Sequence, residues 1–278
     1  MKTYMSRILV IPDLQVRANV SLGHLPCIGK YIVDMKPDYI VQIGDFADCY
    51  ALNSHTSKYE QERVRLVDDV NAVRLAQELL LQPIKEYNDG QRKLKKRQYK
   101  PEMFITLGNH EDRLTRFFNE RPEFIGMFPE DLFQFGENGW TVLPFKEVLE
   151  IDGVFFSHYF QTTSAGNPSS TARALLNRRL ASCIQGHKQG LDWAHSYRPD
   201  GSKISCIIAG SAYNHSEPYM GQQDKTHWRG LVLLDNVKDG DFYESFIPLE
   251  WIKQKYGYKP EEDVCYAGNN YIVDINNP

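Results

Sequence analysis

Continuous apolar runs that end in polar residues organise this chain. Residues 8–11 (Ile-Leu-Val-Ile) form an uninterrupted aliphatic run, which is typical of a strand buried on both faces. Similar runs at 39–43 and 103–107 predict two further buried strands. Between the first two runs, apolar residues at helical spacing over 25–35, closed by Pro37, predict a helix. A strand, a helix and a second strand in this order indicate a parallel β-pair, so the chain begins as an α/β fold.

The same patterns predict further elements along the chain. Apolar residues over 60–87 recur at helical spacing and predict one long amphipathic helix, which Pro83 would kink. Asp152-Gly153 separates apolar runs at 145–151 and 154–158, which predicts a β-hairpin. Helices are also expected over 112–119 and 171–180, followed by a short apolar run over 182–185. Strands over 204–209 and 230–235 are expected to continue the fold antiparallel, with a turn at Asp239-Gly240.

Two segments lack a regular pattern. Residues 120–138 are rich in Pro, Phe and Gly, and we interpret them as an excursion that packs aromatic side chains over the edge of the site. Residues 161–170 are small and polar, which makes them a candidate for a flexible lid or substrate loop.

The composition is ordinary for a soluble globular protein. The chain has 278 residues, of which 42% are hydrophobic and 24% charged, enough to bury a sizeable core. The net charge of −4 gives no global reason to bind nucleic acid or anionic membranes. Five cysteines without CxxC spacing favour reduced thiols over a disulfide framework, and the first apolar stretch is too short for a signal peptide or membrane span. We therefore expect a cytoplasmic protein without a membrane partner.

The stretch 92–100 (Arg-Lys-Leu-Lys-Lys-Arg-Gln-Tyr-Lys) is the main local departure from this even composition. It fits a solvated loop before the next strand, which is what most charged runs are. It also fits a contact with a nucleic-acid phosphate backbone.

Candidate chemistry lies where the predicted strands end. Asp13 follows the first run, Asp45 the second, and Asn109-His110 the third. Taken singly, Asp13 fits an ordinary turn residue and His158 a polar strand end. Because the carboxyl ends of strands in an open α/β sheet form the ligand crevice, we expect these side chains to converge. Two carboxylates at neighbouring strand ends would repel each other unless a cation or a proton lies between them, so a metal site is predicted.

Five sequence blocks now stand in order along the chain. They are D-x-Q (Asp13, Gln15), G-D-x-x-D (Asp45, Asp48), G-N-H-E (Asn109, His110), a strand-end His (His158) and G-H-x-Q (His187, Gln189). In this order they resemble the calcineurin-like metallophosphoesterase superfamily, over residues 7–189 at least. The resemblance implies an α/β fold, a four-layer αββα sandwich of two mixed β-sheets flanked by helices. We expect a single domain over 1–250 and a C-terminal tail over 251–278.

The resemblance also implies a set of metal ligands and roles. Two divalent ions would share Asp45 as the bridging ligand. His110 is similar to the family's leaving-group acid, and Asp48 would orient ligands rather than bind metal. Arg113 could contact the substrate's phosphate together with Asn109, although an Arg in a helix's first turn is more often a surface residue. The expected metal ligands are Asp13, Gln15, Asp45 and Gln189 for the first ion and Asp45, Asn109, His158 and His187 for the second.

Two departures from the family pattern refine these expectations. Gln15 and Gln189 stand where most members have histidine, and oxygen ligands suit Mn better than Zn, so Mn is expected ahead of Mg, Fe, Ni or Zn. A D-x-Q opening is similar to the manganese-dependent nucleoside-diphosphate-type hydrolases of the superfamily. Cys49 and Leu107 replace two arginines that hold phosphate in the protein phosphatases, which makes that activity less expected.

Three functions remain in view. The leading one is a metal-dependent phosphoesterase that hydrolyses a phosphomonoester or phosphodiester with a metal-activated water, on a phosphorylated small molecule, a nucleotide or a nucleic acid. The alternative is a phosphoesterase-shaped binding module that has lost turnover. A zinc-stabilised structural domain is disfavoured because the ligands are scattered and oxygen-rich.

Overall fold

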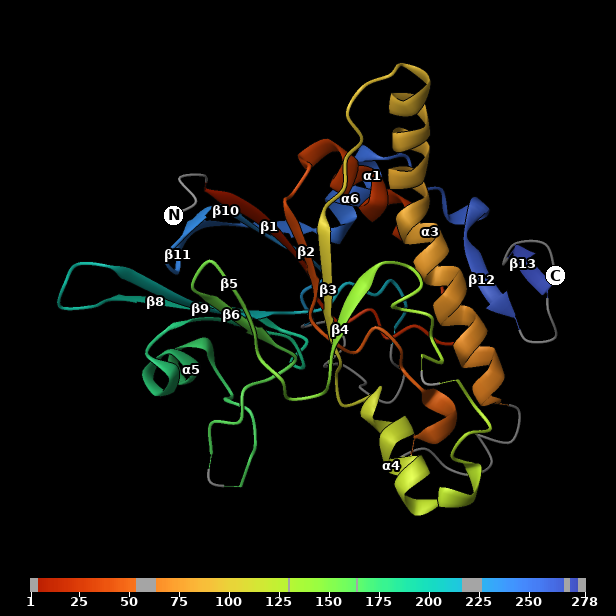
Figure 1. Cartoon of the computed structure of the whole chain (residues 1–278), viewed down its shortest axis with the longest axis horizontal. Coiled ribbons are helices and arrows are strands. Elements are labelled where there is room, and N and C mark those ends of the chain that lie inside the picture. Colours follow the sequence, from red (N-terminus) through yellow and green to blue (C-terminus); the bar gives the residue numbers. More distant parts are fainter. Residues whose placement is uncertain are drawn as a thin grey trace.

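Two β-sheets lie face to face, and helices cover the outer face of each (Figure 1). The computed structural model describes residues 5–53, 64–129, 131–163, 165–216 and 227–267, and the backbone of 271–274. In the described part of the chain, none of the helices combines the length and the apolar character that a membrane span requires.

The first sheet has six strands in the order β11-β10-β1-β2-β3-β4. Four of them are parallel to one another; β10 pairs antiparallel with β1, and β11 pairs antiparallel with β10 at the edge. The parallel strands are β1 (Ser6–Ile11), β2 (Tyr39–Gln42), β3 (Glu102–Thr106) and β4 (Trp140–Leu143), and the edge pair is β10 (Gly230–Lys238) and β11 (Asp241–Pro248).

The second sheet has five strands in the order β5-β6-β7-β9-β8. The predicted hairpin is present, since Asp152 and Gly153 have φ of 48° and 81°, the left-handed backbone that a two-residue hairpin turn needs. Its first strand begins only at Leu149. The strands are β5 (Leu149–Ile151), β6 (Val154–Ser157), β7 (Ser182–Gln185), β8 (Leu191–Tyr197) and β9 (Lys203–Ala209).

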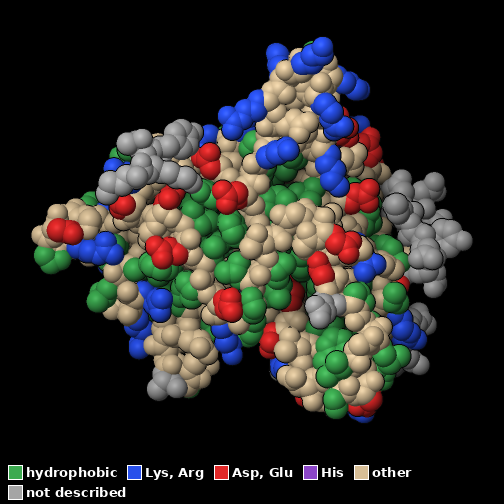
Figure 2. Space-filling view, viewed as in Figure 1, with side chains coloured by type: hydrophobic (Ala, Val, Ile, Leu, Met, Phe, Trp, Pro, Cys, Tyr) green, Lys and Arg blue, Asp and Glu red, His purple; other side chains and the backbone are tan. Residues whose placement is uncertain are grey.

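Three helices cover the first sheet and one covers the second. Helices α1 (Leu25–Met35), α3 (Leu66–Lys93) and α6 (Leu249–Lys255) bury their apolar residues against the six-stranded sheet, and α5 (Ala172–Arg179) packs on the other. The end of α3 projects from the body, and Figure 2 shows Lys and Arg side chains gathered on this projection. Shorter elements are η1 (Tyr50–Leu52), α4 (Asp112–Glu120), η2 (Pro122–Phe124), η4 (Pro260–Glu262) and the pair β12 (Val264–Ala267) and β13 (Tyr271–Asp274).

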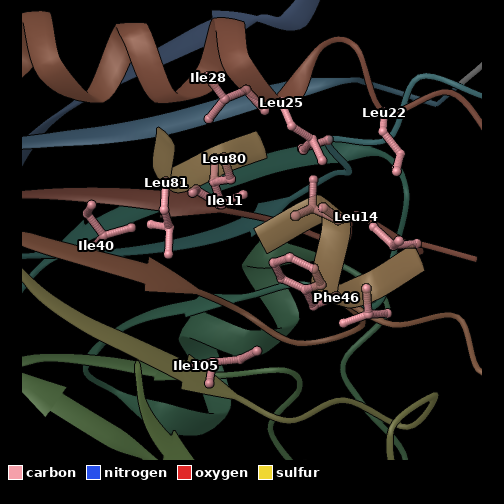
Figure 3. Packing of buried hydrophobic residues seen from close by; sticks show 14 of the residues in the cluster. Ile11, Leu14, Leu22, Leu25, Ile28, Ile40, Phe46, Leu80, Leu81 and Ile105 are labelled. Atoms are coloured by element: carbon pink, nitrogen blue, oxygen red, sulfur yellow. The ribbon is translucent and has the colours of Figure 1, made fainter. Parts of the chain in front are cut away.

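Three separate apolar cores lie between four layers. Side chains alternate along β1, so that Leu9 and Ile11 pack in the helix-side core while Ile8 and Val10 pack between the sheets. Figure 3 shows the helix-side core, where Ile28 and Leu80 from the two helices meet the sheet. The third core lies between the second sheet and α5 and includes Leu175. The predicted four-layer sandwich with two mixed sheets is therefore confirmed.

Several local predictions need correction. The strands near 204–209 and 230–235 do not continue one another, because β9 pairs with β7 and β8 in the second sheet while β10 pairs with β1 in the first. Strands β4 and β8 were not predicted. Helix α3 runs to Lys93 instead of ending at Tyr87, and it continues on both sides of Pro83. The predicted start of that helix at residues 60–63 lies outside the described residues.

The C-terminal segment is hydrogen-bonded to an early loop. The backbone nitrogens of Asn19 and Leu22 donate to the carbonyl oxygens of Tyr266 and Val264, at 2.8 and 2.7 Å. The division into a domain over 1–250 and a tail stays a prediction. All five cysteines are free and buried.

Candidate metal centre

The predicted site residues follow strands of both sheets. Asp13 comes after β1 and Asp45 after β2, while His158 directly follows β6 and His187 follows β7. Asp45 and His187 have φ of 49° and 67°. Such left-handed backbone is uncommon outside glycine and is often found at functional sites. The strand ends therefore present these side chains through sharp turns rather than by extending the strands.

Four of the predicted metal ligands form one compact cluster. Ligand atoms of Asp45, His158 and His187 all lie within 4.8 Å of one another. The amide oxygen Oδ1 of Asn109 lies 2.9 Å from Nε2 of His158 and 2.8 Å from Nδ1 of His187. Nε2 of His158 is also 3.3 Å from Oδ2 of Asp45. A carboxylate, an amide oxygen and two ring nitrogens thus point into one small volume.

The orientation of His158 is fixed from its far side. Its Nδ1 lies 3.0 Å from the carbonyl oxygen of Ile43, to which it can only donate. With the proton on Nδ1, the lone pair of the neutral ring is on Nε2, the atom that faces the cluster.

Two glycines allow the backbone to approach the carboxylates. A Cβ atom at Gly108 would lie 2.1 Å from Oδ1 of Asp45, and one at Gly186 would lie 2.5 Å from Oδ1 of Asp13. Neither distance is possible for a real side chain. The glycines of G-N-H-E and G-H-x-Q are therefore required by close packing against the site's own carboxylates.

Asp13 and Gln189 form a second contact beside the cluster. Nε2 of Gln189 donates to Oδ2 of Asp13 at 3.0 Å, and the backbone nitrogen of His187 donates to Oδ1 of Asp13 at 3.2 Å. Oε1 of Gln189 is buried, and no hydrogen-bond partner for it exists in the described part of the chain. Gln15 is buried in the turn after Asp13, where its backbone nitrogen donates to the carbonyl oxygen of Asp45 at 2.8 Å.

His110 lies between two carboxylates. Its Nδ1 is 2.8 Å from Oδ1 of Asp48, its Nε2 is 3.7 Å from Oδ2 of Asp45, and its backbone nitrogen donates to Oδ1 of Asp45 at 3.0 Å. Arg113 also reaches this group: its Nη1 donates to the carbonyl oxygen of Asp48 at 2.7 Å, and its Nη2 lies 3.3 Å from Nε2 of His110. Arg17, which the sequence did not single out, donates to Oδ2 of Asp48 at 2.5 Å.

The charges in the site shift several pKa values. Burial raises the pKa of Asp45, but His110 and His158 outweigh it and hold the pKa well below its usual range. Burial lowers the pKa of His158, yet the Asp45 carboxylate reverses this and raises it to about 9. Asp45 and His158 thus stabilise each other's charged forms, and a bound divalent cation would take the place of the proton on Nε2 of His158.

Among the neighbouring groups, Asp13 and His187 shift toward their neutral forms, whereas His110 shifts toward its charged form. Burial raises the pKa of Asp13 to about 7; His158 opposes this rise and the Asp45 charge adds to it. Burial and the charge on His158 lower the pKa of His187 to about 4, which leaves a neutral imidazole at pH 7. The pKa of His110 is raised: burial lowers it, and Asp45 and Asp48 more than compensate.

Glu111 is a site residue to which the sequence assigned no role. Its buried carboxylate accepts hydrogen bonds from three backbone nitrogens, those of Ala47 at 2.7 Å, Gly108 at 2.7 Å and Asp45 at 3.1 Å. Glu111 therefore ties the loop after β2 to the loop after β3. The only sequence signal for it is its place as the last letter of the G-N-H-E block.

Comparison with known families agrees with the geometry. A model of the family described as calcineurin-like phosphoesterase matches residues 6–189. The chain belongs to this family. A search among curated proteins finds no match.

Solved structures similar to this calcineurin-like phosphoesterase share little sequence with it. One crystal structure is 11% identical and covers 88% of this chain and 100% of its own, with a TM-score of 0.33. The crystal structure of TT1561 of Thermus thermophilus is 8% identical and covers 87% of this chain and 99% of its own, with a TM-score of 0.34.

The donor set of this phosphoesterase fits a divalent metal. Members of the family typically bind divalent metals, and the cluster of Asp45, His158 and His187 is a candidate site. Carboxylate, imidazole and amide oxygen are ligands that Mn, Fe, Ni and Zn accept. The buried Oε1 of Gln189, which lacks a hydrogen-bond partner in the described residues, is a candidate oxygen ligand on the Asp13 side.

Proposed function

We propose that this protein is a two-metal phosphoesterase that hydrolyses a phosphomonoester or phosphodiester. The observation that supports this most directly is the convergence of Asp45, Asn109, His158 and His187 beside His110. In the proposed roles, this convergence would bring metal ligands and a proton donor together at one place. The favoured substrates are nucleotides or nucleic-acid phosphates, with phosphorylated small molecules as the broader class.

The ligands divide between two ions. Asp45 would bridge them. When bound, the ions would hold phosphate oxygens, lower the pKa of a water and stabilise the attacking and leaving oxygens. The oxygen-rich Asp13 side favours Mn over Zn. The first ion would take Asp13, Gln15, Asp45 and Gln189, and the second Asp45, Asn109, His158 and His187.

His110 would protonate the leaving group. Its Nδ1 is held by Asp48 at 2.8 Å, and the carboxylates of Asp45 and Asp48 raise its pKa, which favours the protonated ring. As the bond between phosphorus and the leaving oxygen breaks, the proton on Nε2 passes to that oxygen, and water supplies the new oxygen on phosphorus. Arg113, which contacts Asp48 and His110, would position the substrate's phosphate together with Asn109.

Hydrolysis of two chromogenic esters tests this function. Wild type and Asp45→Asn are assayed on p-nitrophenyl phosphate and bis-p-nitrophenyl phosphate with Mn, Mg, Zn, Ni or no metal. We expect turnover that depends on Mn and is lost in Asp45→Asn, with the preferred ester distinguishing a monoesterase from a diesterase. No turnover with any metal would overturn the proposal and favour a binding module.

A further inference from the structure

The end of α3 and the segment that returns to β3 form a basic finger, residues 92–100. The finger projects from the body of the molecule, and Lys and Arg side chains are gathered on it (Figures 1 and 2). It adds six positive charges to a chain whose net charge is −4, so the rest of the chain carries −10. All six side chains are exposed: Arg92, Lys93, Lys95, Lys96, Arg97 and Lys100.

Most of these charges are not neutralised within the protein. Arg92 forms an ion pair with Asp89. The other five basic side chains of the finger make no ion pair with any residue that the structure describes. The finger is thus a concentrated positive region on an otherwise acidic protein.

The basic side chains surround a common hollow. A cavity of about 490 Å³ is lined by five of them and by one amide side chain, and by no acidic or apolar residue. Like charges gathered around one hollow repel one another unless an anion lies between them. The lining residues are Arg92, Lys95, Lys96, Arg97, Gln98 and Lys100.

The shape of the finger does not depend on these charges. Backbone nitrogens close the end of the helix, with Lys95 donating to the carbonyl oxygen of Arg92 at 3.1 Å and Lys96 to that of Gln91 at 2.9 Å. The side chain of Asn88 bonds both the nitrogen and the carbonyl oxygen of Tyr99, each at 2.8 Å. The backbone around the hollow is therefore preformed, and its lysines are free for a ligand.

The finger and the metal centre lie at opposite ends of strand β3. Lys100 stands just before Glu102, the first residue of β3, whereas Asn109 follows the far end of that strand. Five residues of strand alone separate the two regions by about 16 Å. A neighbouring cavity of about 530 Å³ includes Asp38, Glu102 and Asp152 in its lining, so acidic side chains border the basic region on that side.

We propose that the basic finger binds the phosphodiester backbone of nucleic acid. Five cations around one hollow exceed the charge of a single phosphate, whereas a nucleic acid presents many phosphates in a row. Because the rest of the chain carries a net charge of −10, electrostatic attraction of a polyanion outside the metal centre is concentrated on the finger. This binding site is separate from the metal centre and does not depend on turnover there.

Salt-dependent DNA binding tests this proposal. The full chain is titrated, without added metal, against a fluorescein-labelled DNA duplex at several salt concentrations from about 50 to 200 mM. The test variant carries Lys95→Gln, Lys96→Gln, Arg97→Gln and Lys100→Gln. We expect its affinity to fall roughly tenfold or more, and the slope of log affinity against log salt to become shallower by up to about 3.6, because four phosphate contacts are lost.

A matched variant keeps the net charge equal. It replaces four exposed lysines elsewhere with glutamine, so both variants have a net charge of −8. We expect it to bind DNA within about twofold of wild type, and both variants to keep the wild-type melting temperature and rate on p-nitrophenyl phosphate. The four control positions are Lys146, Lys238, Lys255 and Lys259.

Three results would overturn the proposal. One is a wild-type protein that does not bind DNA at low salt. The second is an equal loss of affinity in both variants, which would show only an effect of net charge. The third is displacement of the DNA by polyglutamate at equal charge concentration, which would identify the partner as an acidic protein instead.

Discussion

Nε2 of Gln189 donates a hydrogen bond of 3.0 Å to Oδ2 of Asp13, which joins the first and last of the five sequence blocks. Because the amide nitrogen is engaged there, the amide oxygen Oε1 is left buried without a partner in the described residues. A buried carbonyl-type oxygen beside a carboxylate suits a hard cation. In the proposed centre, glutamine at the position of the family's histidine would change the kind of ligand without removing the site.

Substituting Gln189→His should shift metal preference from Mn toward Zn. An imidazole nitrogen would replace an amide oxygen, and nitrogen ligands favour Zn. The measurement is the Zn to Mn ratio of protein dialysed against equal concentrations of both ions. Gln82→His, on the exposed face of α3, is the control and should keep the wild-type ratio. An unchanged ratio in Gln189→His would show that Gln189 is not a ligand.

Gly108→Ala should abolish activity. Its Cβ would lie 2.1 Å from Oδ1 of Asp45, so the carboxylate or the loop must move. The control is Gly90→Ala in α3, where a Cβ meets nothing within 4 Å. It should keep full activity and raise the free energy of unfolding by about 0.5–1 kcal/mol, because alanine favours the helix. Full activity of Gly108→Ala would contradict the required close approach.

Glu111→Ala should destabilise the fold and lower activity together. Three buried backbone N–H groups would lose their acceptor, which should lower the free energy of unfolding by about 3 kcal/mol. Urea denaturation measures this change. Glu111→Gln keeps one acceptor oxygen and should lie between the two. Exposed Glu147→Ala should change stability by less than about 0.5 kcal/mol. A Glu111→Ala protein as stable as that control would refute the tie between the loops.

The convergence of the site's side chains could be predicted from the sequence because they follow strands. Asp13, Asp45 and Asn109 each come after a buried apolar run, and parallel strands place their carboxyl ends at one edge. The partners inside the site were harder to predict. Glu111 acts on backbone nitrogens more than 60 residues away, and no local pattern marks such a contact.

The elements that were not predicted from the sequence are a short strand, an edge strand, and the last turns of a helix that continues through a turn-like sequence. Strand β4 has four residues without clean alternation of burial, and β8 is an edge strand with a single buried side chain. Helix α3 was expected to stop before Asn88-Asp89-Gly90, a turn-like sequence. The helix nevertheless continues to Lys93, where the positive charges of Arg92 and Lys93 interact favourably with the negative end of the helix dipole.

His24 should make the protein sensitive to acid. It is buried, and burial lowers its pKa from 6.5 to about 3; Asp263 opposes this shift. The unfolded chain takes up the proton at the higher pKa, so stability is complete above pH 6.5 and is lost as pH falls toward 3. From pH 6.5 to 5 this loss is about 2 kcal/mol.

Urea unfolding at pH 7 and pH 5 measures this effect. The unfolding free energy falls between pH 7 and pH 5, and this fall should be about 2 kcal/mol smaller in His24→Leu than in wild type. The comparison holds whatever the variant's own stability at pH 7. His195→Leu, at an exposed position of β8, should keep the wild-type difference. Equal differences in all three proteins would exclude His24 as the cause.

The most direct test of the central claim is turnover measured against bound manganese in the same samples. Metal-free protein is titrated with Mn, and bound metal per chain and the rate on the preferred p-nitrophenyl ester are recorded together. We expect the rate to rise with bound Mn and level off at two ions per chain, with Asp45→Asn folded but inactive throughout. A rate that is independent of bound metal, or equal in Asp45→Asn, would contradict a two-metal phosphoesterase centred on Asp45.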